Sequence, residues 1–125
     1  MKLQDALEVR PGEVISLVGS GGKTSIMFAL AKELAAAGGC VITTTTTKIF
    51  EPLLTETPLV IVAKDKAELI NRFLRNAPHY HHITLAKERL DSGKLDGISP
   101  GLVEKLAGIP VVSPVSYTHL TLPTN

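Results

Sequence analysis

A glycine-rich segment between an apolar run and a helical pattern constrains this chain more than any other feature. The segment reads Gly19-Ser20-Gly21-Gly22-Lys23-Thr24. It follows the apolar run 14–18, which is typical of a buried strand, and it precedes residues 23–37, whose apolar residues recur at helical spacing. A strand, a glycine-rich turn, a lysine, a hydroxyl and a helix, in that order, predict a phosphate-binding loop.

The predicted chemistry follows from the backbone of this segment. The first amides of a helix lack intrahelical partners and point the same way, and the helix dipole adds partial positive charge at that end. Glycines let the backbone close around an anion without a Cβ in the way. The residues predicted to bind the phosphates of ATP or GTP are Gly19, Ser20, Gly21, Gly22, Lys23, Thr24 and Ser25.

Two side chains of the segment are given chemical roles. Lys23 supplies a mobile positive charge for the terminal phosphates and is the predicted catalytic residue, and Thr24 supplies a hydroxyl for Mg²⁺. Leu17 stands where the full Walker A pattern has its first glycine, so the loop resembles the shorter P-loops of Mur-ligase-type nucleotide enzymes. The structural alternative is a tight strand-to-helix turn with a chance Gly-Lys-Thr sequence.

Composition bounds the class of protein. A chain of 125 residues with 44% hydrophobic and 20% charged residues is typical of one globular domain. The net charge of +1 indicates neither a nucleic-acid nor a membrane partner, and no apolar run approaches the ~18–20 residues of a membrane span. The single cysteine, Cys40, excludes an internal disulfide, and the N-terminus lacks a signal-peptide pattern. We therefore expect a cytoplasmic protein.

The alternation of apolar runs and helical patterns predicts an α/β fold: three-layer, P-loop-like, with a mainly parallel sheet. The expected strands are residues 13–18, 40–44, 59–63 and 81–86. The expected helices are residues 3–9, 23–37, 65–75 and a short one that begins after Ser99. Asp65 and Ser99 are predicted N-caps, and Gly38-Gly39 is a predicted left-handed helix end.

Five consecutive threonines, residues 43–47, lead into Lys48. The β-branch of threonine favours extended backbone, which is the structural explanation of the first few. Hydroxyls and a lysine that continue past the strand predict a ligand role, because open α/β sheets bind ligands outside the carboxyl ends of their strands. The predicted ligand residues are Thr45, Thr46 and Lys48, which would lie beside the phosphate loop if strands 13–18 and 40–44 are neighbours.

Three other polar groups are interpreted more simply. His79, His81 and His82 do not predict a metal site, because neighbouring residues of a strand point to opposite faces. Residues 87–89 are expected to be a solvated charge run. For Lys94, in a glycine-containing loop, a solvated role and a ligand-facing role are both open.

The first 115 residues and the last ten lead to different predictions. Residues 1–115 are predicted to be the N-terminal part of a P-loop-like nucleotide-binding domain, incomplete at the C-terminus. Residues 116–125 resemble translated sequencing-adapter sequence, so we expect a non-native tail and set it aside for the fold; the alternative is a genuine polar tail.

Three segments together resemble the YqeC family, whose members are described as accessory proteins of selenium-dependent hydroxylases. They are residues 16–25, residues 43–50 and the run Gly93-Lys94-Leu95-Asp96-Gly97-Ile98-Ser99-Pro100. The resemblance implies a role in selenium cofactor biosynthesis, with a molybdenum hydroxylase or its cofactor as partner. It also implies a later Glu-Ala-Asp-Gly-type strand, which this sequence lacks, and Mg²⁺ is then left without its expected acidic partner.

Three functions stay open at this point. The first is an enzyme that uses ATP or GTP for phosphoryl transfer or hydrolysis, although no residue stands out as a general base. The second is a non-catalytic module that delivers a cofactor or acts as a scaffold, and binds nucleotide or another phosphorylated ligand. The third is a loop for a different anion, such as a phosphorylated pterin or selenophosphate, because a helix-start anion site does not name its ligand.

Overall fold

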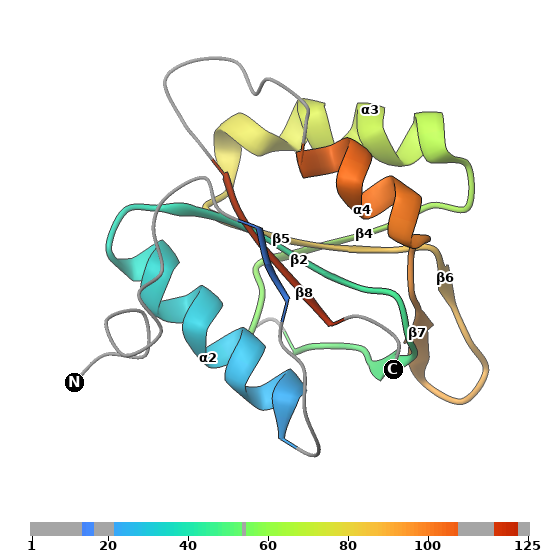
Figure 1. Ribbon diagram of the computed structural model, residues 1–125, viewed down its shortest axis with the longest axis horizontal. Helices are drawn as coiled ribbons and strands as arrows, with labels where there is room; N and C mark the ends of the chain where they lie inside the picture. Colours follow the sequence, from blue (N-terminus) through green and yellow to red (C-terminus); the bar gives the residue numbers. More distant parts are fainter. Residues whose placement is uncertain (1–13, 17–21, 54, 108–116, 123–125) are drawn as a thin grey trace.

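The computed structural model describes residues 14–16, 22–53, 55–107 and 117–122 (Figure 1). Its main element is a five-stranded sheet in the order β1-β8-β2-β5-β4, in which all neighbouring strands are parallel. The strands are β1 (Val14–Ser16), β2 (Cys40–Thr45), β4 (Leu59–Val62), β5 (His82–Ala86) and β8 (Tyr117–Leu122). The expected α/β fold with a mainly parallel sheet is confirmed.

Helices lie on both faces of this sheet (Figure 1). They are α2 (Lys23–Ala36) on one face, and α3 (Lys66–Asn76) and α4 (Pro100–Ala107) on the other, with the 3₁₀ turn η1 (Ala77–His79) after α3. The expected helix 3–9 falls outside the described residues. Among the helices that the structure describes, none combines the length and the apolar character needed to cross a membrane.

The predicted helix ends are confirmed. Asp65 is the N-cap of α3, where its side chain accepts a hydrogen bond from Ala67 N (3.3 Å). Ser99 Oγ accepts one from Leu102 N (3.3 Å) at the start of α4. Gly38 adopts φ +91° after α2, a backbone region that favours glycine, so the helix stops there.

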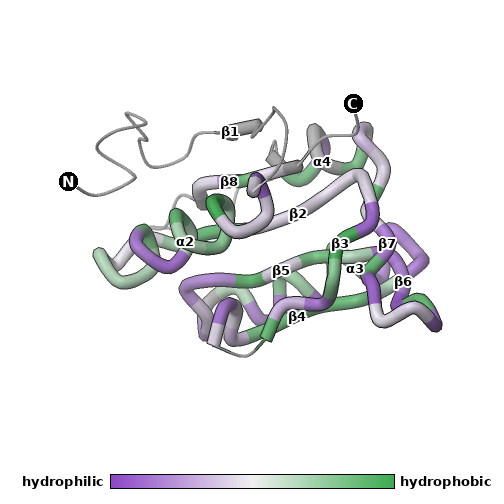
Figure 2. Tube along the Cα trace, turned by 90° about the horizontal axis from the view of Figure 1, so that it is seen from below, coloured by the Kyte–Doolittle hydropathy of each residue, from purple (hydrophilic) through white to green (hydrophobic). Residues whose placement is uncertain are grey.

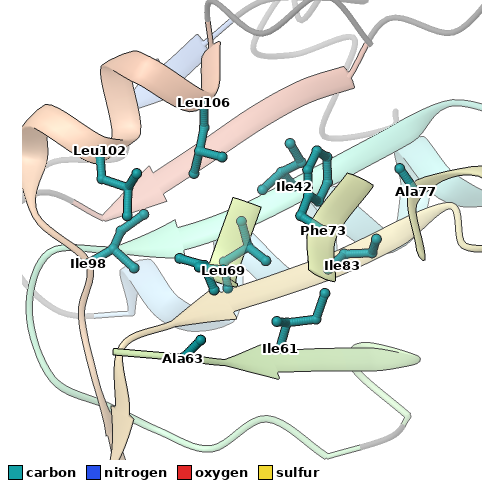
Figure 3. Close-up of a cluster of buried hydrophobic side chains, with 11 residues drawn as sticks. Ile42, Ile61, Ala63, Leu69, Phe73, Ala77, Ile83, Ile98, Leu102 and Leu106 are labelled. Atoms are coloured by element: carbon teal, nitrogen blue, oxygen red, sulfur yellow. The ribbon is translucent and has the colours of Figure 1, made fainter. Parts of the chain in front are cut away.

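Two buried apolar clusters hold the helices on the sheet. On the α2 face, Met27 and Leu30 pack with Val41 of β2 and Leu120 of β8. On the opposite face, α3 and α4 pack on β2, β4 and β5, and Figure 3 shows their side chains pointing toward one another. The members of this second cluster include Leu69, Phe73, Leu102, Leu106, Ile42, Ile61 and Ile83.

A second, smaller sheet was not predicted. It is antiparallel, in the order β3-β7-β6, and its strands are β3 (Ile49–Phe50), β6 (Glu88–Arg89) and β7 (Lys94–Asp96). The expected solvated charge run at 87–89 is confirmed, because Lys87 and Arg89 are exposed and Glu88 is half-buried, although two of its residues form β6. Glu88 pairs with Lys64 (3.0 Å), and Arg89 pairs with Glu51 (2.9 Å). Strands of two or three residues carry no periodicity, so only the tertiary pairing reveals them. Figure 2 shows that the β6–β7 end of the molecule is mostly hydrophilic.

β2 is buried along its whole length, so its threonines need partners inside the sheet. Thr43 Oγ1 lies 2.6 Å from Thr84 Oγ1 and 3.0 Å from His82 Nε2. Thr84 Oγ1 in turn donates to Thr57 Oγ1 (3.0 Å). The threonines at 43–45 all lie in β2, so the expected extended backbone of the first threonines is confirmed.

Residues 117–122, set aside with the tail, form β8 in the middle of the sheet, between β1 and β2. His119 Nε2 lies 2.9 Å from Thr44 Oγ1. The buried atoms His119 Nδ1 and Thr121 Oγ1 have no hydrogen-bond partner among the described residues. Among the described residues, β8 thus places polar atoms without partners in the core. The non-native origin of residues 116–125 stays a prediction.

The contrast between satisfied and unsatisfied threonines is testable with two isosteric substitutions. Thr121→Val removes a hydroxyl without a described partner, so we expect the free energy of unfolding to rise by about 1–2 kcal/mol. Thr84→Val leaves Thr43 and Thr57 without their shared partner, so we expect a fall of about 1–3 kcal/mol. Urea denaturation measures both changes, and a loss of stability with Thr121→Val would contradict this account of β8.

The buried histidines predict an acid-sensitive fold. Burial lowers the pKa of His82 and of His119 from 6.5 to about 4, and for His82 a hydrogen bond with the Glu56 backbone opposes part of this effect. Between pH 6.5 and pH 4, these two histidines are protonated in the unfolded chain but neutral in the folded protein. Their contribution to the free energy of unfolding is therefore complete above pH 6.5 and is lost as the pH falls toward 4. At about 1.4 kcal/mol per pH unit, each histidine contributes roughly 3 kcal/mol to this loss. Denaturation midpoints measured across that window should depend less on pH in His82→Gln, and equal slopes would refute the assignment.

Candidate functional site

The predicted phosphate-binding segment connects β1 to α2. Gly19, Ser20 and Gly21 lie outside the described residues. Gly22 is the N-cap of α2 with φ +69°, a conformation that L side chains rarely adopt, and its carbonyl accepts a hydrogen bond from Ile26 N (3.1 Å). Glycine is therefore the residue type that this strand-to-helix turn requires.

The first turn of α2 has the features of an anion site. Gly22, as the N-cap, has no side chain with which to cap the helix, and no acidic residue stands in the first turn. Lys23 and Thr24 are half-buried at the helix start, and Ser25 is exposed. The positive end of the helix dipole thus stands next to a lysine and two hydroxyls without an acid in that turn, which suits a phosphate group.

The other predicted ligand residues lie at the end of β2. Thr45 Oγ1 is engaged in the turn that follows, 3.1 Å from both the carbonyl oxygen and the amide nitrogen of Thr47. Thr46 is half-buried and lines a cavity, and Lys48 is exposed. Because β8 separates β1 from β2, the strands are not neighbours, and direct strand pairing does not bring these residues to the start of α2.

A cavity of about 290 Å³ lies where β2, β4 and β5 end. Thr46 directly follows β2, Lys64 lies two residues past β4, and Lys87 directly follows β5. The carboxyl ends of parallel strands share one edge of the sheet, which is where open α/β sheets bind ligands. Lys64, Lys66 and Lys87 were not predicted as ligand residues, although their positions just after apolar strand runs were a usable signal.

The segment 93–100 builds one wall of this cavity. Ile98 N donates a hydrogen bond to Thr45 O (2.9 Å), so the loop after β7 lies across the end of β2. A Cβ on Gly97 would collide with Thr45 O and would lie 2.7 Å from Thr46 C, so only glycine permits this approach. Lys94 points elsewhere: its Nζ lies 5.0 Å from the centre of the Phe50 ring, and it does not line the cavity.

The histidines and the cysteine lie apart from these features. His81 is exposed and His82 is buried, in agreement with the expected opposite orientations. Cys40 is buried, with its Sγ 3.7 Å from His81 Nδ1. Within the described ranges, no three histidine, cysteine, aspartate or glutamate residues are grouped so that they could hold a metal ion.

Comparisons with known proteins cover both candidate sites. The family model described as "YqeC protein" matches residues 15–113. The "Uncharacterized protein YqeC" of Escherichia coli (strain K12) is 36% identical over 97 residues, which are 78% of this chain and 36% of the relative. This chain therefore spans little more than a third of that relative's length. No solved structure gives a significant match. The family match includes every cavity residue and ends before β8.

The close approach of Gly97 to β2 is testable against a matched glycine. Gly97→Ala forces backbone against backbone, so we expect a loss of about 1–3 kcal/mol of unfolding free energy. Gly101→Ala, in the first turn of α4 with open space around it, should be neutral or stabilise by up to about 1 kcal/mol. Urea denaturation of both variants checks this, and equal effects would show that the loop does not need glycine at position 97.

Proposed function

Because this chain belongs to the YqeC protein family, we propose that it is a nucleotide-binding protein of selenium cofactor biosynthesis. In this proposal ATP or GTP binds with Mg²⁺ at the start of α2, in a P-loop-like, three-layer fold. The selenium role and the molybdenum hydroxylase partner rest on the family resemblance alone. The proposal that nucleotide binds there is supported by the left-handed Gly22, which has no capping side chain of its own, and by a first helical turn that contains Lys23 and no acidic residue.

The residues at the start of α2 fit a phosphate ligand. The first-turn amides point along the helix axis, where they would face a bound anion, and the Lys23 ammonium adds a full positive charge. The Thr24 hydroxyl is the group that would hold Mg²⁺, which neutralises phosphate charge when it is bound. Neither the first turn of α2 nor β8 contains an acidic residue, so Thr24 and the phosphates would be its ligands there.

A non-catalytic role is the second candidate. The first turn of α2 offers a lysine and hydroxyls for binding, but it holds no carboxylate or histidine as a general base. A protein that holds a nucleotide or another phosphorylated ligand, and delivers a cofactor or acts as a scaffold, needs only the binding groups. A phosphorylated pterin or selenophosphate in place of nucleotide is the third candidate, because the same amides would bind any such anion.

Calorimetry tests the nucleotide site. Lys23→Ala should weaken the binding of ATP or GTP, measured with Mg²⁺, by about tenfold or more, because a charge-assisted contact to phosphate is lost. Lys32→Ala is the matched control, since it removes the same charge from an exposed position on the same helix. Equal weakening in the two variants would contradict a site at the start of α2.

Phosphate release separates the first two candidates. Nucleotide that binds and is hydrolysed, with loss of hydrolysis in Lys23→Ala, identifies the enzyme. Nucleotide that binds without turnover identifies the delivery or scaffold module.

A further inference from the structure

We propose that the cavity at the ends of β2, β4 and β5 is a second binding site, for a small molecule that carries a phosphate or carboxylate group. It is separate from the start of α2 and does not depend on nucleotide binding there. The charge of the cavity walls, the polar and apolar lining residues, and the position of the cavity at the carboxyl edge of the sheet support this site.

Positive charge gathers at this cavity from three separate segments. Lys64 follows β4, Lys66 is the first residue of α3, and Lys87 follows β5. The carboxylate in the lining is Asp96, whose Oδ1 already accepts a hydrogen bond from Gly97 N (3.0 Å). Glu88, outside the lining, neutralises Lys64, so Lys66 and Lys87 against Asp96 leave the described lining with a smaller excess of positive charge, which still favours an anionic ligand.

Two of the three lysines are available for that ligand. Lys64 is paired with Glu88 (3.0 Å). Lys66 and Lys87 form no ion pair with any residue that the structure describes. The backbone of Lys87 is fixed, because its amide donates to Asp96 O (3.0 Å) and ties the end of β5 to β7. This lysine is therefore anchored at the rim of the cavity, although its side chain is exposed.

The remaining lining offers both polar and apolar contacts. Ser99 and Pro100 place the start of α4 at the cavity, where the first turn has no acidic residue and the helix dipole is positive. Pro100 has no N–H and Leu102 N is bonded to Ser99 Oγ, so this helix start adds to the lysines and does not replace them. Ala63, Ile98 and Leu102 supply an apolar surface for the uncharged part of a ligand. A volume of about 290 Å³ is at the lower end of the range for small-molecule sites, so the ligand is small.

The sheet order fixes the relation between the two sites. α2 follows β1 at one end of the order β1-β8-β2-β5-β4, and the cavity lies beyond β2, β5 and β4. Neighbouring strands are ~4.8 Å apart, so the ends of β2, β5 and β4 lie roughly 10–19 Å from the end of β1 along the same edge. Two anion sites on one edge allow two different ligands to bind at the same time.

Nuclear magnetic resonance of the ¹⁵N-labelled chain tests this second site. The probes are inorganic phosphate, pyrophosphate and malonate, each titrated at constant ionic strength. We expect saturable shifts of the Gly97, Ser99 and Gly101 amides with at least one probe. Saturation with the phosphates alone identifies a phosphorylated ligand, and saturation with malonate alone identifies a carboxylate ligand.

Charge-matched variants show whether the cavity lysines are responsible. The double variant Lys66→Ala/Lys87→Ala should weaken the binding seen at those amides by about tenfold or more. The double variant Lys32→Ala/Lys105→Ala removes the same charge from exposed positions outside the cavity and should change it by less than about twofold. All four lysines are exposed, so the amide spectrum of each variant should keep the dispersion of the parent.

The variant Lys23→Ala distinguishes a failure of this second site from a failure of the proposed nucleotide site. Lys23→Ala should leave the shifts of Gly97 and Ser99 unchanged, even where it removes nucleotide binding. The proposal is overturned if no probe gives saturable shifts at these amides, or if the two double variants weaken binding equally.

Discussion

The burial of β2 on both faces is the constraint on which the rest of the structure depends. A strand in that position must satisfy every polar side chain within the protein, and β2 contains three buried threonines. Thr43 and Thr44 bond to residues of β5 and β8, and Thr45 bonds to the turn that follows. These bonds link β2 to its neighbours through side chains as well as through the backbone, so the strand order and the polar pattern are mutually dependent.

The end of β2 also organises the candidate cavity. Thr45 O accepts the hydrogen bond of Ile98 N, and Gly97 has no side chain that would prevent this approach. The segment 93–100 is thereby placed across the carboxyl edge, with α4 starting beside the lysines that follow β4 and β5. The segment 93–100, which carries part of the family resemblance in sequence, thus has a structural role: it closes one side of the cavity.

The two candidate anion sites differ in how far sequence could predict them. The start of α2 is local: glycine, lysine and threonine stand in order between a strand and a helix, and the left-handed Gly22 agrees with that pattern. The cavity is not local, because Lys64 and Lys87 are far apart along the chain and meet only through the pairing of β4 with β5. The roles of Gly19, Ser20 and Gly21 stay predictions, since these residues lie outside the described ranges.

The sequence alone determined the strands β1, β2, β4 and β5, the helices α2, α3 and α4, the helix caps at Asp65 and Ser99, and the parallel α/β class, because these follow from short-range periodicity, capping and turn chemistry. Only the tertiary structure decided that 117–122 lies between β1 and β2, that strands of two or three residues pair into a second sheet, and which threonines are structural. Those outcomes depend on which distant segments become neighbours. That choice is set by the burial and pairing of whole surfaces, and no local pattern in the chain encodes it.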